Sequence, residues 1–208
     1  MWLHNQHWSC GVLRRTAPVL LLSALLLAGC GEPTLPAPFH AAEAGAKYAQ
    51  ADFHLTDHNG KPRTLADFRG KVVVLFFGYT HCPDVCPTTL VDMSRVMTKL
   101  GKDADRVQVL FVTVDPERDK PELLAQYVPA FNPTFLGLYG DAQATAQAAK
   151  SFDIVYQKQP TESGYNVDHT AGSILVDARG KVRLLEPYGQ RTDWLLDDIR
   201  LLLALNRD

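Results

Sequence analysis

The chain has 208 residues, of which 46% are apolar and 21% charged, and its formal net charge is −2. This composition is typical of one soluble globular domain of ordinary size with a leader, and it excludes a disordered chain. The charge argues against the basic class of nucleic-acid-binding proteins, so no nucleic acid is expected among the partners.

Residues 1–29 predict an export signal. Arg14 and Arg15 precede an apolar run over 17–29 that is too short to span a bilayer and ends in small residues. The run leads into Leu27–Cys30 (LAGC), which resembles the lipobox of bacterial lipoproteins, a family in which the cysteine is lipidated and becomes the first mature residue. An uncleaved helical anchor and a plain signal peptide are the alternatives. We expect an exported domain, in the periplasm or another extracytoplasmic space, anchored to the membrane by lipid at Cys30.

Residues 30–47 predict a lipidated N-terminus and a flexible tether. Three prolines lie among alanines and glycines in this stretch, a composition typical of extended linkers. The folded domain is therefore expected over 48–208.

The first elements of this domain are predicted around one buried strand. Phe53 and Leu55 alternate with polar residues before a turn at 57–60, which indicates a hairpin. The continuous apolar run Val72–Gly78 predicts a strand buried on both faces. A helix is expected over Pro87–Leu100, because proline suits a first helical position, so Cys82–Cys86 would occupy a loop or tight turn before it.

The remaining elements alternate between strands and helices. They are expected as a strand over 107–114, a helix over 119–127, a strand over 135–138, a helix over 141–152, a strand over 154–156, a polar loop over 159–164, a hairpin over 173–177 and 182–185, and a helix capped by Thr192. This order predicts an α/β fold with a central mixed sheet flanked by helices. A cysteine motif after the first core strand makes the fold thioredoxin-like.

Cys82 and Cys86 are the candidate reactive pair. A disulfide that closes a five-residue loop would stabilise the fold by only about 2 kcal/mol, which disfavours a purely structural bridge. Three intervening residues place both sulfurs on the same side if the turn is helical, where they can bind one soft ion, Cu(I) or Zn(II), or form a disulfide after a local adjustment. A helix start also favours the thiolate form.

Further ligands are not decided by spacing alone. His169 precedes a core strand, and a lone histidine in that position is usually structural or exposed. His81 is a candidate for tuning the neighbouring thiol or for facing solvent. Asp84 is a candidate for the outer shell of the site or for the helix start, with a solvated carboxylate as the alternative.

The segment Gly78–Pro87 (GYTHCPDVCP) closely resembles the signature of the Sco/SenC family, membrane-tethered copper proteins that assist assembly of cytochrome c oxidase. Three further segments match: Val114–Asp119 (VDPERD), Phe131–Pro133 (FNP), and Asp168–Thr170 (DHT) followed by ILVD at 174–177. The resemblance covers residues 48–205. It implies a thioredoxin-like fold with an added hairpin, and one copper ion per monomer, Cu(I) or Cu(II), held by Cys82, Cys86 and His169.

The resemblance also implies the partners and two competing roles. The leading hypothesis is a metallochaperone that delivers copper to an apo copper-site subunit of the oxidase, with another copper chaperone or a thiol reductase as further partners. The rival is a thiol–disulfide oxidoreductase that uses Cys82 and Cys86 as a redox pair; a peroxidase is a third reading. Only the first role needs His169. No proline lies at 169–171, where thioredoxin-type reductases usually carry a cis-proline, which disfavours a general reductase.

Overall fold

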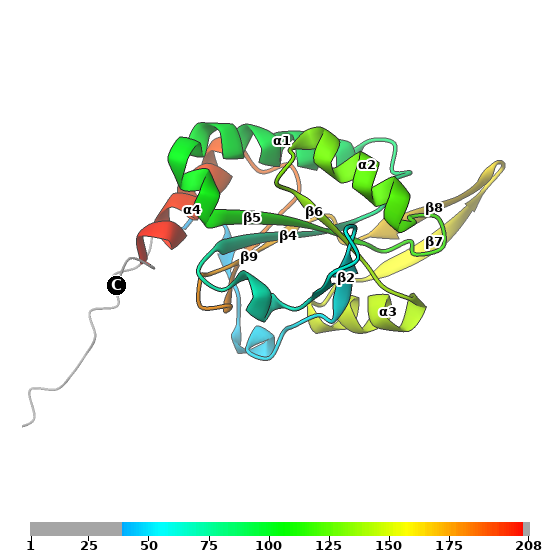
Figure 1. Cartoon of the computed structure of the whole chain (residues 1–208), viewed down its shortest axis with the longest axis horizontal. Helices are drawn as coiled ribbons and strands as arrows, with labels where there is room; N and C mark the ends of the chain where they lie inside the picture. Colours follow the sequence, from blue (N-terminus) through cyan, green and yellow to red (C-terminus); the bar gives the residue numbers. More distant parts are fainter. Residues whose placement is uncertain (1–38, 206–208) are drawn as a thin grey trace, which may run out of the picture. The chain divides into compact units, whose positions relative to one another are not determined.

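A computed structural model describes residues 39–205, in which an eight-stranded mixed sheet forms the core (Figure 1). The strand order is β1-β10-β9-β4-β5-β6-β2-β3. The strands are β1 (Ala42–Glu43), β2 (Leu55–Asp57), β3 (Pro62–Arg63), β4 (Val72–Gly78), β5 (Val107–Thr113), β6 (Leu136–Tyr139), β9 (Ser173–Val176) and β10 (Val182–Glu186). Strand β4 pairs in parallel with β5 and antiparallel with β9, so the predicted mixed sheet is confirmed.

In the described part of the chain, the sheet is covered by the α-helices α1 (Val85–Leu100), α2 (Pro121–Phe131), α3 (Ala142–Ser151) and α4 (Thr192–Leu205). Short 3₁₀ helices lie at Ala46–Tyr48, Leu65–Phe68 and Gly101–Arg106. In Figure 1, α1 and α2 lie above the sheet and α3 lies below it. Below the sheet, the Phe77 ring of β4 packs 5.9 Å from the Phe152 ring, which follows α3. Every residue of β4 is buried, as a strand covered on both faces requires.

Helix α1 begins earlier than the sequence predicts. It starts at Val85 rather than Pro87, so Cys86 lies inside its first turn and not in a loop ahead of it. Pro87 is the third helical residue, and this position is tolerated because the first turn leaves its backbone N–H groups without an intrahelical partner. Helix α2 likewise continues past the predicted end at Tyr127 to Phe131, where the Ser94 hydroxyl donates a 2.7 Å hydrogen bond to the terminal carbonyl.

The segment predicted as a strand over 154–156 and a polar loop over 159–164 is instead a hairpin. Its strands are β7 (Tyr156–Thr161) and β8 (Gly164–His169), joined by a two-residue turn. The hairpin forms a separate two-stranded sheet and extends away from the core at the right of Figure 1. Periodicity could not find it, because most of its residues are exposed and no apolar face alternates along it.

The ordered domain also extends N-terminal to the predicted boundary at residue 48. Ala42 and Glu43 pair with β10, and the Asp198 carboxylate accepts hydrogen bonds of 2.8 Å from the backbone amides of His40 and Ala41. A two-residue strand held by backbone bonds leaves no hydrophobic signal in the sequence. The predicted leader and Cys30 lie outside the described residues.

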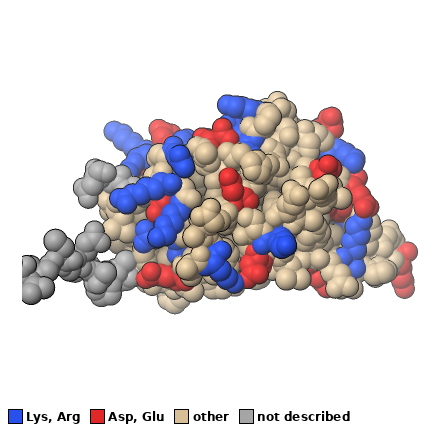
Figure 2. All heavy atoms as spheres, turned by 90° about the horizontal axis from the view of Figure 1, so that it is seen from below, with Lys and Arg blue, Asp and Glu red and all other residues tan. Residues whose placement is uncertain are grey.

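Charge is mixed on the face seen in Figure 2. Lysine and arginine side chains alternate there with aspartate and glutamate. Within residues 39–205, no helix combines the length and the hydropathy that crossing a bilayer requires.

Candidate metal centre

The two cysteines lie in the connection from β4 to α1 and in the first turn of α1. Cys82 is half-buried in the connecting loop and Cys86 is fully buried at the start of the helix; both are free thiols. The backbone N–H of Cys86 points at the Cys82 sulfur, with N and Sγ 3.5 Å apart. A Cβ on Gly78 would lie only 2.9 Å from the Cys86 sulfur, so the last residue of β4 must be glycine for the buried thiol to fit.

The third predicted ligand reaches the cysteines from a distant part of the chain. His169 ends β8, and its Nε2 lies 3.5 Å from the Cys86 sulfur. The ligand atoms of Cys82, Cys86 and His169 all lie within 4.8 Å of one another. Within residues 39–205, no other set of three histidine, cysteine or acidic side chains is arranged to hold a metal ion.

Burial sets the protonation of the site. It raises the pKa of the Cys86 thiol well above its ordinary value and lowers the pKa of His169, because a charged group is poorly solvated there. His169 Nδ1 lies 3.0 Å from the Thr170 carbonyl oxygen, which can only accept, so Nδ1 carries the proton. The Nε2 lone pair is therefore free to face the sulfurs and bind a cation.

Aromatic rings form the wall behind the imidazole. The rings of Phe76 and Tyr79 meet the His169 ring edge-on, with centroids 6.2 and 6.0 Å away. Tyr79 is only 3% exposed, and burial raises the pKa of its hydroxyl. The two rings therefore pack against the imidazole on its buried side.

The other sequence candidates lie at the rim. His81 is exposed, with Nδ1 3.0 Å from the Thr80 hydroxyl and 3.7 Å from a carboxylate oxygen of Asp119. Asp84 occupies the residue before α1 and is exposed, without a side-chain capping hydrogen bond. His81 thus faces Asp119, and Asp84 faces solvent beside α1.

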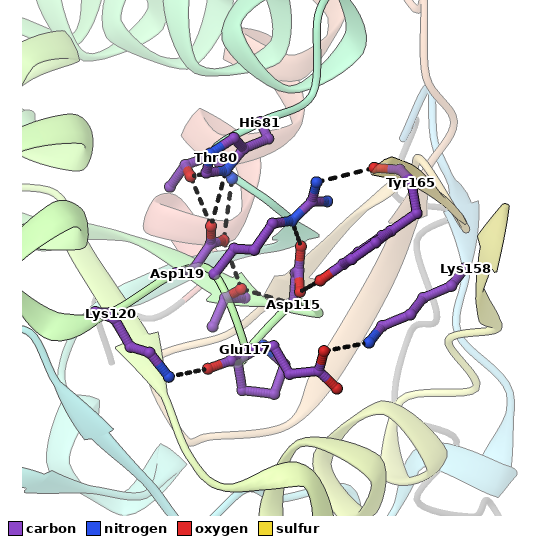
Figure 3. Close-up of polar contacts among 11 residues, drawn as sticks. Thr80, His81, Asp115, Glu117, Asp119, Lys120, Lys158 and Tyr165 are labelled. Atoms are coloured by element: carbon purple, nitrogen blue, oxygen red, sulfur yellow. Dashed lines mark hydrogen bonds and ion pairs between the residues drawn. The ribbon is translucent and has the colours of Figure 1, made fainter. Parts of the chain in front are cut away.

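Sequence reasoning missed the residues that hold the site together. The matching segment at 114–119 carried no predicted role, yet Asp115, Arg118 and Asp119 contact both the cysteine loop and the β7–β8 hairpin (Figure 3). The signal available in the sequence was the motif VDPERD itself, in which an arginine lies between acidic residues directly after a buried strand. Tyr79 lay within the quoted signature, but its sequence context gave no sign that it would face the imidazole.

Two sulfurs and one neutral imidazole nitrogen form a soft donor set. Such a set favours Cu(I) and also accommodates Cu(II) or Zn(II). The same thiols can form a disulfide after a local adjustment, since both are in the free state and lie close together. The geometry therefore supports metal binding and thiol–disulfide exchange.

Comparison with known proteins decides the family. A profile of the SCO1/SenC family matches residues 41–204, which is most of the chain. The chain belongs to the SCO1/SenC family. This confirms the family resemblance seen in the sequence signature.

Individual SCO1/SenC relatives are similar over most of the chain. The mitochondrial SCO2 homolog of Mus musculus is 37% identical over 92% of this chain and 78% of its own length. The Homo sapiens SCO2 homolog is 42% identical over 78% of this chain, which spans 62% of that relative. The structure of Bradyrhizobium japonicum ScoI with copper bound is 41% identical, with a TM-score of 0.67 over 72% of this chain and 96% of that one. The likeness confirms the predicted thioredoxin-like SCO1/SenC fold.

Proposed function

We propose that this protein is a copper-binding metallochaperone that assists copper-site assembly of cytochrome c oxidase. The observation that carries the proposal is the convergence of Cys82, Cys86 and His169 within 4.8 Å of one another. Membership of the SCO1/SenC family and likeness to a copper-bound relative support it. The proposed cargo is one copper ion per chain, and the proposed recipient is an apo copper-site subunit of the oxidase. Another copper chaperone or a thiol reductase is a further proposed partner.

The unequal exposure of the two thiols indicates how the ion moves. Cys86 is fully buried and Cys82 is half-buried, so a partner's ligand reaches the ion from the Cys82 side. The ion then leaves by ligand exchange, in which a partner thiolate takes the place of one protein sulfur at a time. His169 is neutral when empty because burial lowers its pKa, and it binds the ion without first losing a proton.

Substitution of His169 by alanine tests the proposal. The reduced parent chain is expected to bind one Cu(I), and tight binding needs all three ligands. His169→Ala is expected to bind Cu(I) more weakly by at least the ~10- to 100-fold that the loss of an outer contact of a ligand costs, although two thiolates remain. Competitive titration with a chelator of known affinity measures this. His58→Ala is the control, since His58 lies on the β2–β3 turn and contacts Gly137 instead. Equal affinity of parent and His169→Ala would remove the imidazole from the site.

A second candidate function is thiol–disulfide exchange, favoured by the Cys86 N–H that faces the Cys82 sulfur. The Cys82 thiolate would attack a disulfide in the oxidase subunit, forming a mixed disulfide and releasing one client thiolate. Cys86, after losing its proton, would attack Cys82, releasing the second client thiolate and leaving a Cys82–Cys86 disulfide. Two electrons pass to the client, and a dithiol reductase restores the pair. Complementation separates the roles, because an active His169→Ala variant favours the reductase and an inactive one favours the copper chaperone.

We also propose export and lipid anchoring at Cys30, supported by the basic, apolar and small-residue order of residues 1–30. Replacing Cys30 with serine is expected to move the protein from the membrane fraction to the soluble extracytoplasmic fraction. Fractionation of cells expressing parent and Cys30→Ser measures this, with Ser23→Ala as a control inside the leader. Continued membrane retention of Cys30→Ser would favour an uncleaved helical anchor.

A further inference from the structure

The ligands of the metal centre come from two different sheets. Cys82 and Cys86 follow β4 in the centre of the main sheet, whereas His169 ends the separate β7–β8 hairpin. Among residues 39–205, the two hairpin strands form backbone ladders only with each other. Strand β9 begins at Ser173, four residues after His169, and pairs with Phe76 of β4, so the chain brings the base of the hairpin near the cysteine loop. The direction in which the hairpin leaves the sheet, and with it the 3.5 Å distance from His169 to Cys86, also depends on contacts along the side of the hairpin.

One side of this connection is Asp119, which is 1% exposed. Its carboxylate accepts hydrogen bonds from the Thr80 amide at 3.0 Å, the Thr80 hydroxyl at 2.6 Å and the Thr113 hydroxyl at 2.7 Å. Figure 3 shows Asp119 facing Thr80 and His81. Thr80 lies two residues before Cys82, so Asp119 fixes the cysteine loop to the end of β5.

The other side of the connection is the ion pair between Arg118 and Asp115, both of which contact Tyr165 of the hairpin. Arg118 donates a 2.9 Å hydrogen bond to the Tyr165 carbonyl, and the Tyr165 hydroxyl donates one of 2.9 Å to Asp115. The guanidinium also stacks 3.7 Å from the centroid of the Tyr165 ring and 5.7 Å from that of Tyr79. Tyr79 is the ring that meets His169 edge-on, so Arg118 contacts both the hairpin and the wall behind the imidazole.

Both sides belong to one short turn. The backbone amides of Arg118 and Asp119 both donate to the Asp115 carbonyl, at 3.2 and 2.9 Å, which gives the turn a fixed shape. We propose that this turn, Asp115–Asp119, is a brace that sets the distance between the thiols and the imidazole, with Arg118 as the positioning residue for His169. The inference rests on the proposed copper site and assigns the brace no ligand role.

A purely structural ion pair is the alternative explanation. Arg118 and Asp115 would then stabilise the domain like any other half-buried pair, with no specific effect at His169. The chain offers a matched pair for comparison, because Arg183 contacts the buried Asp177 on the β9–β10 turn at 3.3 Å. It also offers an exposed pair between the same turn and the same hairpin, Glu117 with Lys158 at 2.6 Å. Exposed ion pairs of this kind contribute little to the stability of a fold.

The test uses Arg118→Lys, which keeps the charge but loses the planar fork, and Tyr165→Phe, which keeps the ring but loses the bond to Asp115. We expect each variant to bind copper about 10-fold more weakly than the parent. A loss of that size is typical when an outer contact that orients a metal ligand is removed. The Cu(II)-loaded variants are expected to lose part of the nitrogen hyperfine signal of His169 in electron paramagnetic resonance. Without metal, both variants are expected to show faster amide hydrogen exchange across 156–169.

The controls are Arg183→Lys and Glu117→Gln, which are expected to match the parent in all three measurements. Parent-like nitrogen signal, copper affinity and exchange in both Arg118→Lys and Tyr165→Phe would overturn the inference. So would equal losses in Arg183→Lys, because the effect would then be general destabilisation. If Arg118→Lys fails to fold, Tyr165→Phe decides. A parent chain that binds no copper would instead contradict the proposed function, and the exchange measurement would still test the brace.

Discussion

Replacing Cys86 with serine is expected to abolish tight copper binding while leaving the domain folded. Cys86 is fully buried between Gly78 and His169, and a hydroxyl is a poor ligand for a soft ion. The loss should exceed ~100-fold, beyond the 10- to 100-fold typical of outer contacts. Because burial raises the pKa of this thiol, copper uptake by the parent must displace its proton, so copper affinity should fall as the pH falls.

Chelator competition and calorimetry in buffers of different ionisation enthalpy measure these effects together. The parent should release a proton from Cys86 on binding copper, and Cys86→Ser should release fewer. Thr89→Ser, one turn along α1, is a matched control because the Thr89 hydroxyl donates its hydrogen bond to the Val85 carbonyl of the same helix and serine keeps that donor. Near-parent affinity in a folded Cys86→Ser variant would show that Cys86 is not a ligand.

Replacing Glu186 with glutamine is expected to stabilise the protein at alkaline pH. Glu186 ends β10 and is 5% exposed; burial and the nearby Asp198 raise the pKa of its carboxyl from 4.5 to about 7, although a contact with Gln190 partly opposes this. Within the described residues, its Oε2 atom has no hydrogen-bond partner. The folded state therefore holds the Glu186 proton more tightly than the unfolded state does.

The sign of the pH dependence follows from that raised pKa. The stabilisation from the bound proton is fully present below pH 4.5 and is lost as the pH rises through about 7. The difference between the carboxyl pKa of 4.5 in the unfolded state and about 7 in the folded state corresponds to about 3 kcal/mol in the free energy of unfolding. Glu186→Gln lacks the titration, so it should match the parent near pH 4.5 and exceed it by up to about 3 kcal/mol above pH 8.

Denaturant unfolding of both proteins at several pH values measures the difference. Glu43→Gln is the control, since Glu43 lies exposed on the neighbouring strand β1. A parent and a Glu186→Gln variant that differ by the same amount at every pH would contradict a buried, titrating carboxyl. A destabilised variant at pH 8 would show that the ionised form has a partner in the folded protein.

The central strand was predictable because its whole environment is apolar. Val72–Gly78 reads as one unbroken hydrophobic run, and the structure gives it the same bounds. The first residue of α1 could not be predicted, because Pro87 is tolerated at both the first and the third helical position. The structure places it third. The β7–β8 hairpin was missed because its strands are polar and exposed and are held by the ion pair of Arg118 and the ring of Tyr165.

The sequence by itself determined the chemistry available to this protein: two thiols at a helix start and, through the family signature, a histidine far along the chain. Only the tertiary structure decided that this histidine stands 3.5 Å from Cys86 and that Asp115–Asp119 holds the hairpin that carries it. The physical reason is the separation along the chain between the residues that interact. Strand and helix signals arise between neighbours a few residues apart, whereas the metal centre depends on contacts between segments more than eighty residues apart, which periodicity does not record.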